Sequence, residues 1–133
     1  MKGKNNALAV TVLLPVVIAL AGCAAIPVKP GFDDTVFQQP APVVQRAAID
    51  ALIATGFDIT ESEPLYAEGY RPRKRDSGTS CGGETVGIWL EAVEPSKTGV
   101  RVATAMSSYG IMCQKSWNGE ILDEMQKALG KRQ

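Results

Sequence analysis

Hydrophobic residues recur at helical spacing in two stretches that flank a central region with a different pattern. In the first stretch the apolar residues that share one helical face are Val44, Ala48, Ala51 and Leu52, with Ile49 and Ile53 beside them. Gly56 follows at the point where a helix would stop, so the pattern predicts a helix over about residues 41–55. The second stretch predicts a helix that ends at Gly130, with apolar residues at every fourth position: Trp117, Ile121, Met125 and Leu129, broadened by Leu122 and Ala128.

The central region has the alternation typical of β-strands in four segments: residues 57–61, 65–71, 86–93 and 99–107. The faces expected to be buried carry Val86, Ile88, Leu90 and Ala92 on the third strand, and Val100, Val102, Thr104 and Met106 on the fourth. The links are short, and residues 94–98 with Pro95 predict a hairpin turn. We therefore predict an α+β fold, a four-stranded antiparallel meander with both helices on one face, in the order helix, four strands, helix (α-β4-α).

The sheet face turned away from the predicted helices is unusually aromatic for a face in contact with solvent. Strand alternation places six side chains on it: Tyr66, Tyr70, Trp89 and Arg101, with Glu68 and Val93. Tyr, Trp and Arg are enriched at binding surfaces, so this face is the candidate for a partner contact. The alternative is that the aromatic rings pair across strands and stabilise an exposed sheet. Trp117, by contrast, belongs to the predicted core.

The amino-terminal end has the features of an export signal. Lys2 and Lys4 give it a positive start, and residues 7–20 are apolar but too few to span a bilayer as a stable helix. Leu20-Ala21-Gly22-Cys23, which closes this stretch, resembles the lipobox of bacterial lipoproteins. The resemblance implies that Cys23 receives a diacylglyceryl thioether, becomes the first residue of the mature chain and is acylated at its new amino terminus. The alternative is an ordinary secretory signal cleaved near Ala24 or Ala25, or an uncleaved anchor.

The lipobox also implies a location and a domain organisation. Two or more acyl chains hold a protein on a membrane essentially permanently. Ala24 stands where lipoproteins retained at the inner membrane usually have aspartate, which implies an outer-membrane lipoprotein facing the periplasm, with residues 1–22 as its signal peptide. Residues 24–42 contain four prolines and little periodicity. We therefore predict a lipid-anchored tether over residues 23–42 and a single domain over residues 43–133 that can stand off the membrane.

Removal of the signal peptide changes both the charge and the cysteine count. Loss of Lys2 and Lys4 leaves 12 Lys plus Arg against 14 Asp plus Glu, a formal charge of −2, which gives no general attraction to nucleic acid. With Cys23 assigned to lipid, Cys81 and Cys113 are a single pair in an oxidising compartment. We predict a disulfide between them, because the predicted strand order places both in links at the same end of the sheet. A pair of free thiols is the alternative.

Candidate catalytic and metal-binding groups are scarce in this sequence. The chain contains no histidine, which is the commonest general base and metal ligand, and no phosphate loop, dinucleotide-binding motif or CxxC pair. We therefore predict a protein that is not an enzyme and needs no metal or cofactor besides its covalent lipid. The one concentrated charge feature is the basic run that contains Arg73, Lys74 and Arg75. It is a candidate for contact with an anionic envelope polymer or an acidic partner, and the alternative is a solvated loop.

The carboxyl-terminal third resembles small lipoproteins of unknown function from bacterial envelopes. The likeness is carried by Thr98-Gly99-Val100-Arg101-Val102, Gly110, and Ser116 to Ile121-Leu122. In those proteins a T-x-V-x-I/V strand leads through a glycine loop into a helix that starts at serine and carries an Ile-Leu pair. The resemblance implies an αβ fold with no catalytic residues to carry over, and this sequence departs from it at Cys113 and in the link at 71–85.

These features together predict a non-enzymatic outer-membrane lipoprotein that binds an envelope protein or an anionic envelope polymer and no nucleic acid. The alternative hypothesis is a periplasmic inhibitor or immunity protein against a toxin or lytic enzyme, in which the disulfide-held loops would act as a plug.

Overall fold

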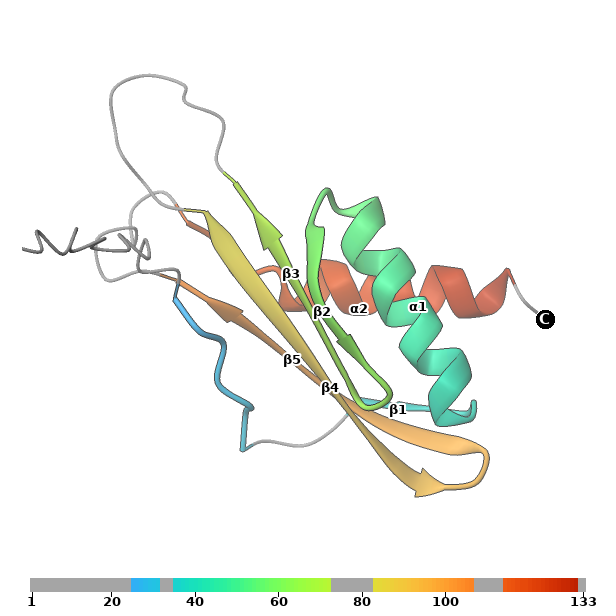
Figure 1. The fold of residues 1–133 in the computed structure, drawn as a ribbon. Coiled ribbons are helices and arrows are strands. Elements are labelled where there is room, and N and C mark those ends of the chain that lie inside the picture. Colours follow the sequence, from blue (N-terminus) through green and yellow to red (C-terminus); the bar gives the residue numbers. More distant parts are fainter. Residues whose placement is uncertain (1–24, 32–34, 73–82, 107–113, 132–133) are drawn as a thin grey trace, which may run out of the picture.

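In the part of the chain that the structure describes, five antiparallel strands form one sheet, and two helices lie against one of its faces (Figure 1). The computed structural model describes residues 25–31, 35–72, 83–106 and 114–131. The helices are α1 (Ala41–Ala54) and α2 (Asn118–Gly130). The strands are β1 (Thr35–Phe37), β2 (Asp58–Glu63), β3 (Tyr66–Arg71), β4 (Glu84–Glu94) and β5 (Lys97–Ala105), in the sheet order β1-β5-β4-β3-β2. The predicted α+β class, the antiparallel meander of β2 to β5 and the two helices on one face are confirmed.

The prediction of four strands is wrong, because β1 adds a fifth strand along the free edge of β5. Phe37 pairs with Thr98 across this edge and enters the core with 6% of its surface exposed. Thr98 ties the junction further by donating a hydrogen bond from Oγ1 to the carbonyl oxygen of Gln39, at 2.8 Å. The predicted tether of residues 23–42 therefore needs correction, since its carboxyl-terminal part belongs to the folded domain.

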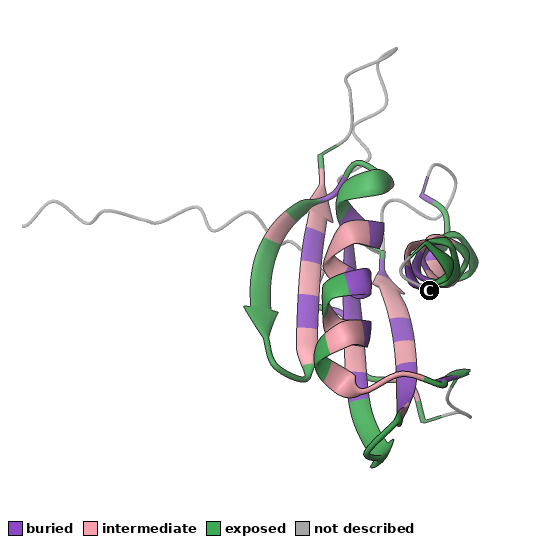
Figure 2. Ribbon diagram, turned by 90° about the vertical axis from the view of Figure 1, so that its right-hand side faces the viewer, coloured by how far each residue is buried: buried purple, intermediate pink, exposed green. Residues whose placement is uncertain are grey.

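The hydrophobic core lies between the sheet and the helices, and Figure 2 shows the buried positions alternating along the strands. The largest fully buried side chains come from both helices and from β4 and β5, and they include Leu52, Ile88, Ile121 and Met125. A Cβ placed at Gly69 would lie 2.9 Å from the Cβ of Phe57 and 3.2 Å from Cδ2 of Leu52. The absence of a side chain at Gly69 thus lets the end of α1 approach β3 closely.

The predicted inner face of β4 and β5 is correct in the middle of each strand and wrong at the ends. Val86, Ile88 and Val102 are buried, whereas Ala92 is exposed near the β4–β5 hairpin, whose tip is green in Figure 2. Met106 follows the last residue of β5 and is 45% exposed. The helices cover only the central part of the sheet, so alternation alone overestimates the length of the buried face.

Local sequence sets the ends of the helices. Pro42 stands in the first turn of α1, where a missing backbone N–H is tolerated. Gly56 has φ of +85° just past the end of α1, the left-handed conformation that glycine adopts most easily, and it ends the helix as predicted. At the start of α2, the backbone N–H of Trp117 donates a hydrogen bond to Oγ1 of Thr104, at 2.8 Å. This bond fixes the beginning of α2 to β5.

Candidate functional site

The sheet face opposite the helices is called the outer face below, and it carries Tyr66, Tyr70, Trp89 and Arg101. Strand register places Tyr66, Trp89 and Arg101 in one row across β3, β4 and β5. Tyr70 lies on the same side of β3, because alternate residues share a face and the intervening Ala67 and Gly69 are buried toward the helices. The structure therefore brings together the four side chains grouped from the sequence, and all four are partly exposed.

A small polar network and a ring contact hold Tyr66 and Trp89 of the outer face in place. The rings of Tyr66 and Trp89 lie with centroids 5.2 Å apart and planes tilted by 45°. The Tyr66 hydroxyl donates to Oε2 of Glu68 and the Thr60 hydroxyl donates to Oε1 of the same carboxylate, both at 2.8 Å. Burial raises the pKa of Tyr66 well above its ordinary value, and the Glu68 hydrogen bond and the negative charges of Glu68 and Glu61 raise it further. Tyr66 is thus a neutral hydrogen-bond donor with a fixed orientation.

Residues 25–31, called the N-terminal segment below, lie across the outer face, on the side of the sheet opposite the helices (Figure 1, blue). Pro27 is buried there against Gly87 and Trp89: a Cβ built on Gly87 would lie 3.0 Å from Cγ of Pro27 and 2.8 Å from Cη2 of Trp89. Arg101 donates a hydrogen bond from Nη1 to the carbonyl oxygen of Pro30, at 3.5 Å. This segment was predicted to be part of the tether over residues 23–42, and its contacts with the sheet correct that prediction.

A cavity of about 210 Å³ remains between the N-terminal segment and the outer face. Its walls are formed by Ala25, Ile26 and Pro27 on one side and by Thr60, Glu68, Tyr70 and Thr85 on the other. Sequence reasoning missed both Pro27 and Gly87 as members of this site. The available signal was Gly87 itself, because a glycine in the interior of a strand often marks the close approach of another segment.

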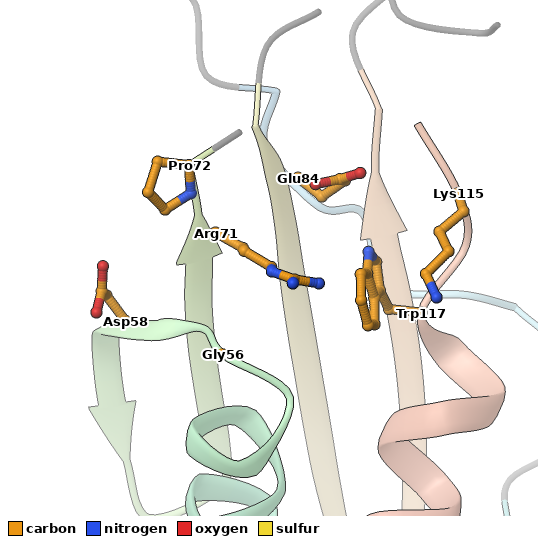
Figure 3. A pocket seen from close by; sticks show the side chains of 7 residues that line it. All are labelled: Gly56, Asp58, Arg71, Pro72, Glu84, Lys115 and Trp117. Atoms are coloured by element: carbon orange, nitrogen blue, oxygen red, sulfur yellow. The ribbon is translucent and has the colours of Figure 1, made fainter. Parts of the chain in front are cut away.

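A second cleft, of about 600 Å³, opens at the end of the sheet (Figure 3). Its walls are Gly56, Asp58, Arg71, Pro72, Glu84, Lys115 and Trp117. Figure 3 shows the indole of Trp117 between the side chains of Arg71 and Lys115. The guanidinium carbon of Arg71 lies 4.5 Å from the centroid of the indole, and Nζ of Lys115 lies 3.8 Å from it. Because cations occupy the two sides of the ring, Trp117 is not available to stack on a ligand.

Trp117 is therefore a structural anchor, and its predicted place in the core is confirmed by an exposure of 8%. Its indole also meets Phe57 edge-on, with ring centroids 5.4 Å apart. Lys115 contacts Glu120 as well as the indole, because its ammonium group forms an ion pair with Glu120 at 2.6 Å. The cleft carries charges of both signs, since Asp58 and Glu84 line it together with Arg71 and Lys115, and we assign it no ligand.

Several residues singled out from the sequence lie outside the described residues: Cys23, Arg73, Lys74, Arg75, Cys81 and Cys113. The chain on either side of the two internal segments is described, however. Arg71 at the end of β3 pairs with Glu84 at the start of β4. The side-chain amide of Gln114 donates a hydrogen bond from Nε2 to the carbonyl oxygen of Gly83, at 3.1 Å. Gly83 and Gln114, the first described residues after these two segments, therefore lie next to each other.

Among the residues that the structure describes, no group of three or more Cys, His, Asp or Glu side chains could hold a metal ion. Within the same residues, neither helix has the length and apolar character needed to cross a membrane.

Comparison with known proteins gives a similarity of fold. No protein family model matches the chain, and no curated protein sequence matches it. Among solved structures, the chain is similar to the adenylate sensor from AMP-activated protein kinase, crystallised in complex with 5-aminoimidazole-4-carboxamide 1-β-D-ribofuranotide. The TM-score is 0.51 at 13% sequence identity, and the match covers 73% of this chain and 98% of the other. At this identity the likeness concerns the arrangement of strands and helices alone.

Proposed function

We propose that the protein is a non-enzymatic outer-membrane lipoprotein whose domain binds another envelope component through the outer face. The sequence Leu20-Ala21-Gly22-Cys23 followed by Ala24 supports lipid attachment and sorting to the outer membrane. A chain that contains no histidine supports a binding role rather than general acid–base catalysis. The proposed partner is an envelope protein or an anionic envelope polymer.

The observation that carries this proposal is the clustering of Tyr66, Tyr70, Trp89 and Arg101 on one partly exposed face of the sheet. Tyr, Trp and Arg provide most of the large single-residue contributions at protein interfaces. The hydrogen bond to Glu68 and the ring contact between Tyr66 and Trp89 hold these two aromatic side chains in place before any partner binds. Less conformational entropy is then lost on binding.

A crosslinking pulldown from intact cells tests the binding role. We expect Trp89→Ser to reduce capture of the partner strongly, because an interface aromatic contributes about 2 kcal/mol or more, which corresponds to roughly 30-fold in affinity. Ile53→Ser is the matched control, since Ile53 is 59% exposed on α1, on the helix side of the molecule. Equal capture by wild type and Trp89→Ser would rule out the outer face as the contact surface.

Lipid attachment is tested separately by metabolic labelling with a clickable fatty acid. Cys23→Ala should abolish the label and release the protein from the membrane fraction, because the thiol is the acceptor in the proposed modification. If Cys23→Ala is labelled as strongly as the wild type, the lipoprotein assignment is wrong.

The alternative role, an inhibitor or immunity protein, is favoured by one observation at the end of the sheet. The hydrogen bond from Gln114 to Gly83 holds together the points where two segments rejoin the fold. Cys81 lies two residues before Gly83 and Cys113 directly before Gln114, a spacing that supports the proposed disulfide between them. Two loops joined by a disulfide could fill the active site of a toxin or lytic enzyme. The basic run Arg73-Lys74-Arg75 in the first loop is the proposed contact for an anionic polymer.

A further inference from the structure

The N-terminal segment contacts the outer face through its prolines rather than through its larger apolar side chains. Ile26 and Val28 are 82% and 78% exposed, while Pro27 between them is buried. If the contact were only general burial of apolar surface, Ile26 would face the sheet, because it has more apolar surface to remove from water than Pro27. The segment therefore places Pro27, and not Ile26 or Val28, against the outer face.

The shape of the groove explains this preference. Gly87 has no side chain, and the ring of Trp89 leans over it, so a shallow site for a flat ring is left on β4. A methyl group at Gly87 would occupy the space of Pro27, at 3.0 and 3.1 Å from its Cγ and Cβ. The site thus requires glycine on the protein and a compact ring on its occupant.

The second proline extends the contact by three residues. Pro30 is partly buried, and its carbonyl oxygen accepts the hydrogen bond from Arg101. Residues three apart lie on the same side of an extended proline-rich segment, which turns once every three residues. In Pro27-Val28-Lys29-Pro30 the burial follows this period, since Pro27 is buried and Pro30 is half-buried, whereas Val28 and Lys29 are exposed. Grooves lined by aromatic side chains recognise P-x-x-P segments in this manner in other proteins.

We propose that the outer face is a binding site for extended peptides with two prolines three residues apart, and that the N-terminal segment is its built-in occupant. This inference rests on the proposed binding role of the outer face and specifies its ligand class. The cavity of about 210 Å³ beside Tyr70 and Thr85 is left unfilled by the N-terminal segment. A partner peptide with a larger side chain at the position of Ala25 or Ile26 can fill it, and it then displaces the N-terminal segment.

Binding of a short labelled peptide to the full chain, purified in detergent, tests this inference by fluorescence anisotropy. The probe has the sequence of residues 25–31, and a second probe has alanine in place of both prolines. The wild type should bind the first probe weakly, because a tethered occupant competes at an effective concentration in the millimolar range. In the Pro27→Ala protein the occupant is weakened, so the same probe should bind at least about fivefold more tightly. The probe without prolines should not bind measurably.

Adding Gly87→Ala to Pro27→Ala should reduce binding of the first probe about tenfold or more, because the new methyl group overlaps the proline site. Gly119→Ala is the matched control, since a Cβ at Gly119 meets nothing within 4 Å. Melting temperatures of all variants confirm that the fold is retained, and the comparison of the two probes on Pro27→Ala does not depend on Gly87→Ala folding.

Equal binding of the two probes, or no binding to the Pro27→Ala protein, overturns the peptide site. The proposed binding role fails by a different result, namely undiminished capture of the envelope partner by Trp89→Ser. Loss of capture by Trp89→Ser together with no peptide binding would therefore leave the function in place and remove only this ligand class.

Discussion

Replacing Trp117 with alanine should destabilise the domain more than any other aromatic substitution among the described residues. The indole is 8% exposed and contacts Phe57, Arg71 and Lys115. Loss of the ring would leave a cavity where α2, β3 and the end of α1 meet.

The size of the effect follows from opposing contributions. Burial of a tryptophan and the cavity left by its removal give about 3–5 kcal/mol for Trp→Ala. One term acts in the other direction: Nε1 of Trp117 is buried with no hydrogen-bond partner among the described residues, and removing such a group recovers roughly 1 kcal/mol. We expect a net loss of about 3 kcal/mol, which lowers the melting temperature by roughly 12–24 °C in a domain of this size.

Urea denaturation followed by far-ultraviolet circular dichroism measures this loss without relying on tryptophan fluorescence. Trp89→Ala is the comparison, because Trp89 is partly exposed and its ring contacts Tyr66 and the N-terminal segment rather than the core. It should cost about 1 kcal/mol. A loss below about 1 kcal/mol for Trp117→Ala, or a larger loss for Trp89→Ala, would contradict the assignment of Trp117 as the anchor of α2.

Two further predictions concern ionisation and the cysteines. The pKa of Tyr66 is raised in the folded chain above its ordinary value near 10, so the contribution of Tyr66 to stability is fully present below pH 10 and is lost as the pH rises above it. The urea midpoint should therefore decrease less between pH 9 and pH 11 for Tyr66→Phe than for the wild type. An equal decrease in the two proteins would disprove the role of the Tyr66 hydroxyl. For the proposed disulfide, the intact mass should rise by two hydrogens on reduction, and Cys81→Ser should lower stability by about 3–4 kcal/mol, since the bond closes a loop of roughly 33 residues. Quantitative alkylation of two thiols without reduction would refute it.

The sequence alone was sufficient to predict the helices and strands that have a repeating pattern of apolar residues. The helices were predictable because each carries an apolar stripe of several turns, and the four strands β2 to β5 because each alternates over five or more residues. β1 has only Thr35, Val36 and Phe37, too few for a period of two to be recognised. Its position depends on pairing with β5, about 60 residues away in the sequence, which no local pattern reports.

The site was predictable in part for the same reason. Alternation placed Tyr66, Tyr70, Trp89 and Arg101 on one face, but it could not show that the N-terminal segment lies over that face. The contact between Pro27 and Gly87 joins residues from a segment without regular structure and from the centre of a strand. Prolines in a segment without periodicity are typical of linkers, so composition favoured the wrong interpretation of residues 25–31.

The position of the N-terminal segment determines how far the domain can move from the membrane. If Cys23 carries the lipid, only two residue steps separate the acylated end from Ala25, a span of at most about 7 Å. The domain would then rest directly on the bilayer, with the exposed Ile26 and Val28 beside the lipid headgroups. Release of the segment by a competing peptide would free the twelve residue steps from Cys23 to Thr35, which extend to about 40 Å. Replacement of the N-terminal segment by a partner peptide at one proline site would thereby convert a domain fixed at the membrane surface into one that can move away from it by the length of the released segment.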